Sequence, residues 1–251
     1  MIIFEQKCVA YLKQELKFYE SLDVLSKYIN FCLMRSELEA YHKKEGFKYY
    51  SFSGFQPKGD DVKNGFYKSG ETYGFTIRSL DEKFLESLAA ALRQNVDNPN
   101  LLVVQTSKKV LKNFFISELY SVNPVIVTSG NDENGRQIFW TIEKDGDIMK
   151  LQKQLHENLL KKYESFYGEE LKTSQNFIQL LEIKNKKPQN IVMRKKDDKQ
   201  GEQKVTFFGN KFKIVPNEDE VSQKLAFVAM ACGLGEKNSY GGGFCLGKGM
   251  R

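Results

Sequence analysis

Residues 233–243, with the sequence GLGEKNSYGGG, are the most informative stretch of this 251-residue chain, and we call them the glycine loop. Five of these eleven residues are glycine. Glycine lacks a Cβ atom, so it adopts positive φ angles and allows another backbone to approach closely. A tight loop of this kind can point successive backbone N–H groups at an anion, and phosphate is the obvious candidate. Because the loop lies near the C-terminus, we expect the fold to tolerate valine at Gly235 or Gly243.

The glycine loop follows a predicted helix and precedes a short apolar strand. Residues 218–231 carry apolar residues such as Val221 and Leu225 at helical spacing, with acidic residues in the first turn. Nucleotide-binding phosphate loops have the opposite order, because they follow a strand and begin a helix. The GxxxxGK[ST] spacing is also missing, which argues against a nucleotide hydrolase. A helix C-cap glycine followed by a turn is the simpler alternative, and it explains Gly233 or Gly235 better than the later glycines.

The spacing of the glycine loop resembles the C-terminal signature of the CRISPR-associated endoribonucleases that cut repeat RNA into guide RNAs. That signature is glycine, a hydrophobic residue, glycine, five residues, glycine, any residue and glycine, and residues 233–243 match it in full. Gly242 occupies a place that is more often aromatic or hydrophobic in the family. The resemblance implies an RNA-binding loop, with contacts from Gly233, Gly235, Lys237, Gly241 and Gly243.

The resemblance extends to residues 41–53, YHKKEGFKYYSFS, which look like the family's histidine segment leading into a strand. Family members with a known active site commonly use a tyrosine on the first helix, this histidine and a lysine a few residues later. Tyr28, His42 and Lys48 occupy those places, so the resemblance implies that these three are catalytic. Each also has a structural alternative: Tyr28 as a core aromatic, His42 at a helix C-terminus, and Lys48 as an exposed strand residue.

Histidine is scarce in this chain, which contains only His42 and His156. Histidine is the side chain whose unperturbed pKa lies nearest to neutrality, so it suits the proton transfers of RNA cleavage. His156 lies among polar residues of a predicted helix, and we expect it on the surface. His42 is flanked by lysines and can take a proton from an RNA 2′-hydroxyl or give one to the departing 5′-oxygen. Lys48 can neutralise charge that develops on the phosphate.

Positive charge is concentrated in residues 184–213, which we call the basic segment. It contains ten basic and three acidic residues, an excess larger than the net charge of +6 of the whole chain. Such clustering is typical of proteins that bind nucleic acids. A solvated β-hairpin with a lysine-protected edge explains the charge equally well. We expect Arg194, Lys195 and Lys196 to contact the RNA backbone without reading its sequence.

Composition bounds the remaining possibilities. With 251 residues and 41% hydrophobic content, the chain can form one large packed domain or two small ones. Four cysteines without a CxxC pair, together with two histidines, give no ligand cluster at zinc spacing, so we expect reduced thiols, no metal and no cofactor. No apolar stretch approaches the roughly 20 residues of a membrane span, and the N-terminus lacks a signal-peptide pattern. We therefore expect a cytoplasmic protein that does not bind membranes.

Hydrophobic periodicity predicts two successive β-α-β-β-α-β units, the ferredoxin-like pattern. No repeat is visible at the residue level, so the second unit rests on element order and on the family resemblance. We expect an α+β fold of two tandem ferredoxin-like domains, residues 1–120 with the catalytic residues and residues 121–251 with a basic hairpin and the glycine loop. The predicted strands are 2–12, 47–55, 73–77, 101–105, 125–128, 138–140, 177–183, 191–193, 204–215 and 243–246, and the predicted helices are 22–33, 81–94, 148–167 and 218–231.

The resemblance implies a metal-independent endoribonuclease that cleaves CRISPR repeat RNA. Attack of a 2′-hydroxyl would leave a 2′,3′-cyclic phosphate and a 5′-hydroxyl. The alternative is a non-catalytic repeat-RNA-binding subunit of a CRISPR effector complex, which would not use His42, and a third class is a protein-interaction module. The expected partners are CRISPR repeat RNA, proteins of an effector complex and a second copy of this chain.

Overall fold

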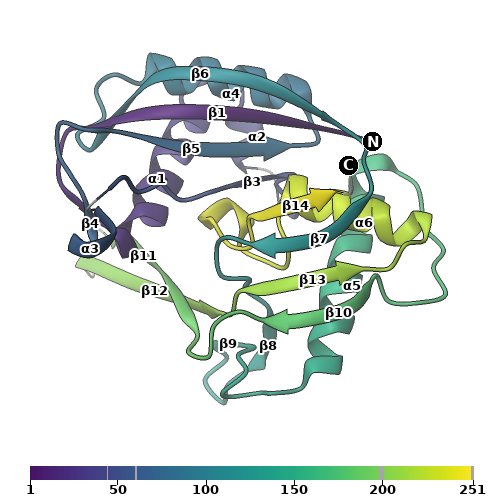
Figure 1. Ribbon diagram of the computed structural model, residues 1–251. Coiled ribbons are helices and arrows are strands. Elements are labelled where there is room, and N and C mark those ends of the chain that lie inside the picture. Colours follow the sequence, from purple (N-terminus) through teal and green to yellow (C-terminus); the bar gives the residue numbers. More distant parts are fainter. Residues whose placement is uncertain (44, 60, 198–200, 250–251) are drawn as a thin grey trace.

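The computed structural model describes residues 1–43, 45–59, 61–197 and 201–249, and Figure 1 shows its arrangement. Two four-stranded antiparallel sheets make up the two halves of the molecule, and each carries helices on one face. The chain completes the first sheet before it enters the second. Helix α6 (Glu220–Cys232) lies between the two halves.

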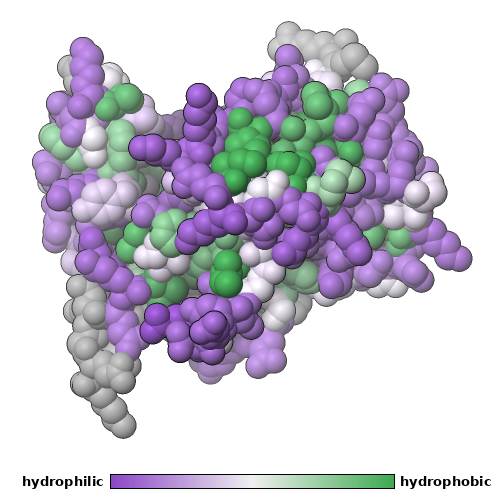
Figure 2. Space-filling model, turned by 90° about the horizontal axis from the view of Figure 1, so that it is seen from below, coloured by the Kyte–Doolittle hydropathy of each residue, from purple (hydrophilic) through white to green (hydrophobic). Residues whose placement is uncertain are grey.

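Hydrophilic side chains cover most of the face seen from below, and hydrophobic side chains gather in several groups within it (Figure 2). Among the described residues, no helix combines the length and the apolar character needed to cross a membrane. The apolar side chains are gathered instead in the cores behind the two sheets.

The first sheet has the strand order β3-β5-β1-β6. In chain order, the first strand is central, the last is at one edge, and a helix follows the first and third strands of the unit. This is the β-α-β-β-α-β arrangement of a ferredoxin-like fold. Its elements are β1 (Ile2–Leu12), α1 (Ser21–Met34), β3 (Tyr50–Phe52), β5 (Thr72–Ser79), α4 (Glu82–Gln94) and β6 (Leu101–Lys112). Shorter elements between them are β2 (Leu16–Lys17), η1 (Phe18–Glu20), α2 (Glu39–Lys43), α3 (Asp61–Asn64) and β4 (Phe66–Tyr67).

The second sheet repeats this order as β10-β13-β7-β14. Its main elements are β7 (Ile116–Ser121), α5 (Ile148–Tyr167), β10 (Ile178–Ile183), β13 (Phe212–Pro216), α6 and β14 (Cys245–Gly249). Two hairpins are inserted, β8 (Thr128–Asn131) with β9 (Gln137–Phe139) and β11 (Gln189–Asp197) with β12 (Gly201–Gly209), and η2 (Asn238–Tyr240) lies within the glycine loop. The two sheets share one topology, which confirms the predicted tandem ferredoxin-like fold.

Aspartate caps fix where the three long helices after the first begin. Asp81, Asp147 and Asp219 each accept a hydrogen bond from the backbone N–H three residues later, at 2.9 to 3.0 Å. Such caps satisfy backbone donors that the first helical turn leaves free. Helices α4, α5 and α6 therefore begin within two residues of the predicted positions.

Strand β7 was not predicted, and the change of sheet occurs earlier than expected. It takes place between Lys112 and Ile116, ahead of the predicted boundary at residues 120 and 121. A β-bulge explains the missed strand, because Ile116 pairs with Gly249 and Glu118 pairs with Lys248 across an irregular register. The bulge breaks the period-two alternation of apolar residues from which a strand is recognised. The predicted strand at 125–128 forms only isolated bridges and the start of β8.

Helix α6 joins the two halves through its packing. Residues 225–232 are all buried, because the helix contacts strands of the first sheet on one side and of the second sheet on the other. A helix that is apolar on every side belongs in a core. Polar bonds reinforce this junction: Ser51 Oγ donates to the Ala231 carbonyl at 3.0 Å, and Arg78, which is ion-paired to Glu5, donates to the Cys245 carbonyl at 2.7 Å.

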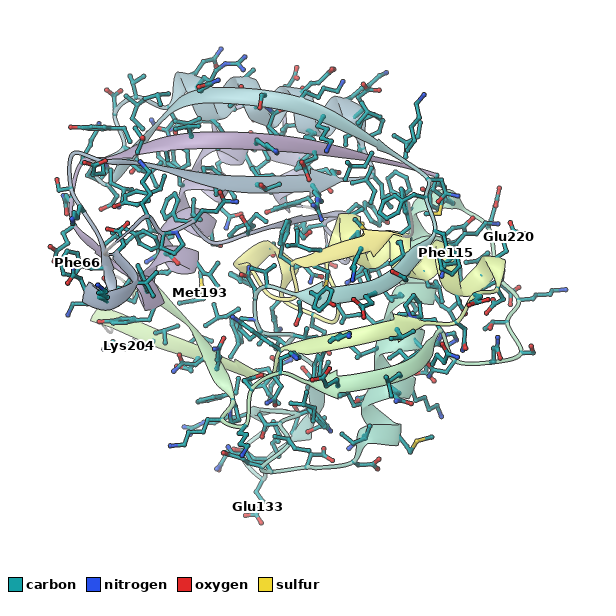
Figure 3. The ribbon with its side chains drawn as sticks, in the orientation of Figure 1. Phe66, Phe115, Glu133, Met193, Lys204 and Glu220 are labelled. Atoms are coloured by element: carbon teal, nitrogen blue, oxygen red, sulfur yellow. The ribbon has the colours of Figure 1, made fainter. Side chains whose placement is uncertain are left out.

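The β11–β12 hairpin leaves the second sheet and packs against the first half. Met193 lies on the inner side of the hairpin, where Leu22 of α1 packs against the same small apolar cluster (Figure 3). Arg194 Nη2 donates to Glu20 Oε1 at 2.6 Å. The hairpin is therefore held by the first half of the chain as well as by its own strand pairing.

His156 is buried, so its predicted surface position is wrong. It lies one residue after Leu155 on the inner face of α5, and its Nδ1 accepts a hydrogen bond from the Phe177 N–H at 3.1 Å. Burial lowers the pKa of His156 below its usual value of 6.5. The polar neighbours that suggested a surface position lie on the outer face of the helix. His156 is therefore a structural residue that ties α5 to the start of β10.

This burial predicts acid-dependent stability. The unfolded chain binds a proton at His156 more readily than the folded protein does, so the stability contributed by neutral His156 is lost as the pH falls below about 6.5. A His156→Gln variant keeps an acceptor for Phe177 but does not titrate. Urea unfolding at pH 7.5 and 5.5 should show a larger loss of unfolding free energy in the wild type than in His156→Gln. Equal losses in the two proteins would contradict this role, since titration of His42 is common to both.

Candidate functional site

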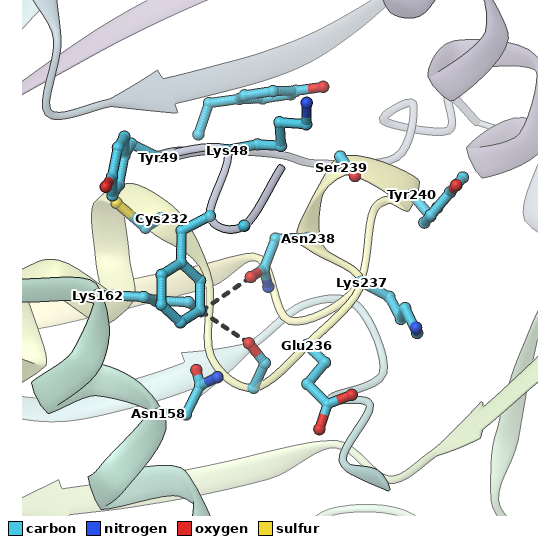
Figure 4. A pocket seen from close by; sticks show the side chains of 14 residues that line it. Lys48, Tyr49, Asn158, Lys162, Cys232, Glu236, Lys237, Asn238, Ser239 and Tyr240 are labelled. Carbon is cyan, nitrogen blue, oxygen red and sulfur yellow. Dashed lines mark hydrogen bonds between the residues drawn. The ribbon is translucent and has the colours of Figure 1, made fainter. Parts of the chain in front are cut away.

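A pocket of about 330 Å³ lies between the glycine loop and the segment that follows α2 (Figure 4). Residues 46–50 form one wall and residues 235–240 form another. Asn158 and Lys162 reach the pocket from α5, and Cys232 reaches it from the end of α6. The two segments singled out in the sequence, far apart along the chain, therefore meet at one site.

Lys162 holds the glycine loop in place. Its Nζ donates to the carbonyl oxygens of Gly233 and Gly235 at 2.7 Å each, and to Asn238 Oδ1 at 2.8 Å (Figure 4). The side chain is only 2% exposed, and burial lowers its pKa to about 8. Three acceptors match the three N–H groups of an ammonium, so this lysine replaces its lost hydration with loop contacts.

Sequence reasoning missed Lys162. Its position three residues after Leu159, on the same face of α5 as Leu151 and Leu155, is the one signal that it points inward. A lysine on an apolar face is more often assigned to the surface, because its aliphatic stem can reach past the core to water. Only the folded loop supplies the acceptors that make its burial favourable.

The glycines of the loop are required for close packing. Gly243 has a φ of +67°, and a Cβ atom there would lie 1.9 Å from the Leu234 carbonyl oxygen. Gly235 has a φ of +69°, and its Cβ would lie 2.6 Å from the Ile126 carbonyl oxygen. The expectation that the fold tolerates valine at Gly235 or Gly243 is therefore wrong. A site near the C-terminus of the chain is not necessarily peripheral in the fold.

Several amides of the loop bond to the protein itself. Four of the loop's glycines donate backbone hydrogen bonds at 2.9 to 3.0 Å, Gly233 to Ala229, Gly241 to Asn238, Gly242 to Lys237 and Gly243 to Pro124. These bonds correct the expectation that the glycine amides of the loop point at phosphate. Residues 235–240 are the part of the loop that lines the pocket.

Lys237 has an unusual backbone within that lining. In the described part of the chain it is the only non-glycine residue with a positive φ, at 58°. Such conformations cost of order 1 kcal/mol or more and persist where the surrounding structure fixes them. Its Nζ lies 5.5 Å from the centroid of the Phe207 ring. Lys237 thus lines the pocket with a left-handed backbone, and its RNA contact stays a prediction.

Lys48 joins the pocket to α2. It lines the pocket, and its Nζ donates to the carbonyl oxygen of Tyr41 at 2.9 Å. Tyr41 directly precedes His42, whose backbone belongs to α2 and whose side chain lies outside the part of the structure that is described. Two of the three predicted catalytic residues are therefore brought to the same region of the molecule.

Tyr28 lies elsewhere, in the core of the first half, and its catalytic role stays a prediction. Its side chain is 1% exposed in the core between α1 and α4, and its hydroxyl donates to the Leu92 carbonyl at 2.6 Å. Burial also raises its pKa, so the hydroxyl is a poorer proton source. The structure favours the alternative of a core aromatic, and Tyr28 does not line the pocket.

Part of the basic segment is already paired within the protein. Arg194 is bonded to Glu20, Lys184 lies 2.8 Å from Glu182, and Lys213 lies 2.6 Å from Glu118. Arg194 therefore serves hairpin docking, which weakens the prediction that it contacts RNA. Lys195 and Lys196 belong to β11, but their side chains lie outside the described part, and their RNA contacts stay a prediction.

Comparison with known families identifies the chain. Residues 106–246 match the family described as CRISPR associated protein Cas6, C-terminal, which is more than half of the 251 residues. The chain belongs to the Cas6 family. The matched region contains β7, α5, α6 and the glycine loop, so it includes the second sheet and one wall of the pocket.

Individual relatives extend the likeness to the whole chain. The "CRISPR-associated endoribonuclease Cas6 2" of Methanocaldococcus jannaschii is 28% identical over 217 residues, 84% of this chain and 86% of that protein. A solved "CRISPR associated protein Cas6" has a TM-score of 0.69 and 22% identity, with 98% of this chain and 99% of the other covered. A structure from a Cas6-related gene of Pyrococcus furiosus has a TM-score of 0.68 and 14% identity, with 99% and 100% covered. The Cas6 likeness therefore includes both sheets.

We predict that Gly243→Ala destabilises the protein far more than Gly168→Ala. Both glycines have similar φ values, +67° and +72°, but nothing lies within 4 Å of a Cβ at Gly168. The backbone conformation alone should cost about 1 kcal/mol in each variant. The collision with Leu234 should raise the cost at Gly243 to roughly 3 kcal/mol or more. Urea unfolding measures both values, and similar costs would show that the loop relaxes around an added side chain.

We predict that Lys162→Met lowers the free energy of unfolding by about 3 kcal/mol or more. The substitution leaves three buried acceptors without their donor, at about 1 kcal/mol or more each. Lys161→Met is the matched control, because Lys161 is exposed on the same helix, and its effect should stay within about 0.5 kcal/mol. Chemical denaturation of the two variants measures the difference. Equal effects would mean that the ammonium contributes no more than its desolvation costs.

Proposed function

We propose that this Cas6-family protein is a metal-independent endoribonuclease that cleaves CRISPR repeat RNA. The observation that carries the proposal is the meeting, at one pocket of a tandem ferredoxin-like fold, of the glycine loop and residues 46–50, which include Lys48 and follow the helix that carries His42. The curated relative described as an endoribonuclease supports the activity, and its likeness extends over 84% of this chain.

The proposed reaction needs two proton transfers and stabilisation of charge on one phosphate. The 2′-oxygen of the RNA attacks the adjacent phosphorus while its proton passes to a base. The bond from phosphorus to the 5′-oxygen then breaks, and that oxygen takes a proton. The products are a 2′,3′-cyclic phosphate and a 5′-hydroxyl. His42 is the residue we assign to proton transfer, either as the base or as the acid.

Lys48 is assigned to the developing negative charge. A pentacoordinate phosphate carries more charge on its oxygens than the starting diester, so a fixed cation beside it lowers the barrier. The bond from Lys48 to the Tyr41 carbonyl keeps this ammonium next to α2. The same bond supports a shared role for Lys48 and His42, because it couples the pocket wall to the helix that carries the histidine.

The RNA path proposed here extends from the pocket toward the β11–β12 hairpin. Lys237 lines the pocket and lies over Phe207 of that hairpin. Lys195 and Lys196 follow Arg194 along β11, and Lys204 pairs with Arg194 in register. Cations in this order would neutralise successive phosphates and position the strand without reading its bases. Repeat RNA as the partner and the cytoplasm as the location belong to this same proposal.

His42→Ala tests the assignment. The variant should reduce the single-turnover cleavage rate of cognate repeat RNA by roughly 100-fold or more, with little change in RNA affinity. Lys43→Ala is the control on the same helix and should cleave at close to the wild-type rate. Added imidazole should restore part of the lost rate in His42→Ala. An unchanged rate in that variant would contradict the assignment of His42, whereas absence of cleavage by the wild type would leave an RNA-binding subunit as the better description.

The same assay separates metal-independent cleavage from metal-dependent cleavage. Cleavage should persist in EDTA and should fail on RNA with a 2′-deoxy nucleotide before the cut, because the attacking oxygen is then missing. Loss of cleavage in EDTA with recovery in Mg²⁺ would overturn the mechanism. Analysis of the product ends identifies the cyclic phosphate directly.

A further inference from the structure

Asn158 has an unpaired amide oxygen at the edge of the pocket. Its Oδ1 is buried and has no hydrogen-bond partner within the described residues. Asn238, the other asparagine of the pocket, is fully engaged: Oδ1 accepts from Lys162, and Nδ2 donates to the Gly242 carbonyl at 2.9 Å. Buried amide oxygens in proteins are nearly always paired, so an unpaired one requires an explanation. A ligand that donates to Asn158 is such an explanation.

The pocket has the size and the walls of a site for one nucleobase. Its volume of about 330 Å³ lies at the lower end of the range of small-molecule sites, roughly 300–1,000 Å³. Phe47 and Tyr240, both half-buried, stand on its two opposing segments. RNA-binding proteins hold unstacked bases against aromatic side chains in this way. An unpaired amide beside aromatic walls is therefore suited to a base.

Four other polar side chains of the pocket are bonded within the protein or carry charge. Lys162 donates its three N–H groups to the glycine loop. Glu236 accepts from the Thr128 N–H at 3.0 Å and from the Thr128 hydroxyl at 2.7 Å, which holds its carboxylate toward β8. Lys48 and Lys237 are cations suited to phosphate. Asn158, which projects from α5 one turn before Lys162, is the pocket residue whose buried amide oxygen lacks a partner within the described residues (Figure 4).

We propose that this pocket holds the nucleobase next to the cleaved phosphate and that Asn158 reads its edge, with adenine preferred. A carboxamide presents a donor and an acceptor side by side, and the adenine edge formed by the N6 amine and N7 presents the complementary pair, whereas the corresponding edge of cytosine has an amine alone. The position next to the cleaved phosphate rests on the proposed function, since Lys48 lines the same pocket. Asn158 is thereby a specificity-determining residue.

Binding of non-cleavable RNA tests this inference. Repeat RNAs with a 2′-deoxy nucleotide before the cut are varied through the four bases at each of the two nucleotides that flank the cut. The wild type should bind RNA with adenine at one of these positions about tenfold or more tightly than RNA with the other bases there. Asn158→Leu, of similar size but without hydrogen-bonding groups, should lose that preference. It should keep the affinity of the wild type for the disfavoured bases.

Two further variants keep the test decisive. Glu157→Gln changes an exposed residue of the same helix and should preserve the preference. Asn158→Asp removes the donor and retains an acceptor, so it should weaken adenine binding while cytosine, which offers an amine, is less affected. If Asn158→Leu does not fold, Asn158→Asp still tests whether Asn158 determines the base preference. No base preference in the wild type, or a preference unchanged in the Asn158 variants, would overturn the inference.

Cleavage of all-ribose RNA, measured in parallel, separates this inference from the proposed function. A protein that cleaves RNA but shows no Asn158-dependent preference retains its proposed function and loses this inference. A protein that shows the preference but does not cleave retains the base site and loses the proposed activity.

Discussion

The pocket depends on one buried ammonium. Lys162 bonds to two carbonyls and one side chain of the glycine loop, and these contacts fix the wall that faces residues 46–50. The loop's backbone conformation, with left-handed glycines in close contact with neighbouring chain, is compatible with only a narrow range of shapes. Taking a lysine out of water is costly, so the cation and the loop stabilise each other only when both are in place. Helix α5, which carries Lys162, therefore determines the position of the loop that forms this wall of the pocket.

The sequence was informative where local chemistry decides the structure. Helical periodicity placed α4, α5 and α6 almost to the residue, because apolar stripes and the aspartate caps that the structure shows act within a few residues of the chain. Strand β7 was not predicted because a bulge interrupts the alternation of its apolar residues. The roles of Tyr28, His156 and Lys162 were harder still to predict, because the hydrogen-bond partner of each side chain comes from a distant segment. Glycine spacing identified the loop correctly but suggested anion binding where the structure shows mostly packing.

The division of labour within the site follows from these placements. Residues that build the pocket, such as Lys162 and the loop glycines, form hydrogen bonds within the protein. Residues proposed to meet RNA, such as Lys48, Lys237 and Asn158, stand on that frame and keep groups toward the cavity. A substitution in the first set therefore acts through stability, and one in the second set acts through rate or affinity. Measuring unfolding beside activity distinguishes the two.

Helix α6 limits how this protein can be divided into separately folded halves. The two sheets have the same topology, which suggests two equivalent modules, yet residues 225–232 complete the packing of both. Cutting the chain between β6 and β7 would remove α6 from the first half, where it packs against the sheet in addition to α1 and α4. In the second half, the cut would expose the apolar side of α6 that faces the first sheet. The symmetry of the fold is therefore one of connectivity alone. We therefore expect the two ferredoxin-like halves to unfold together.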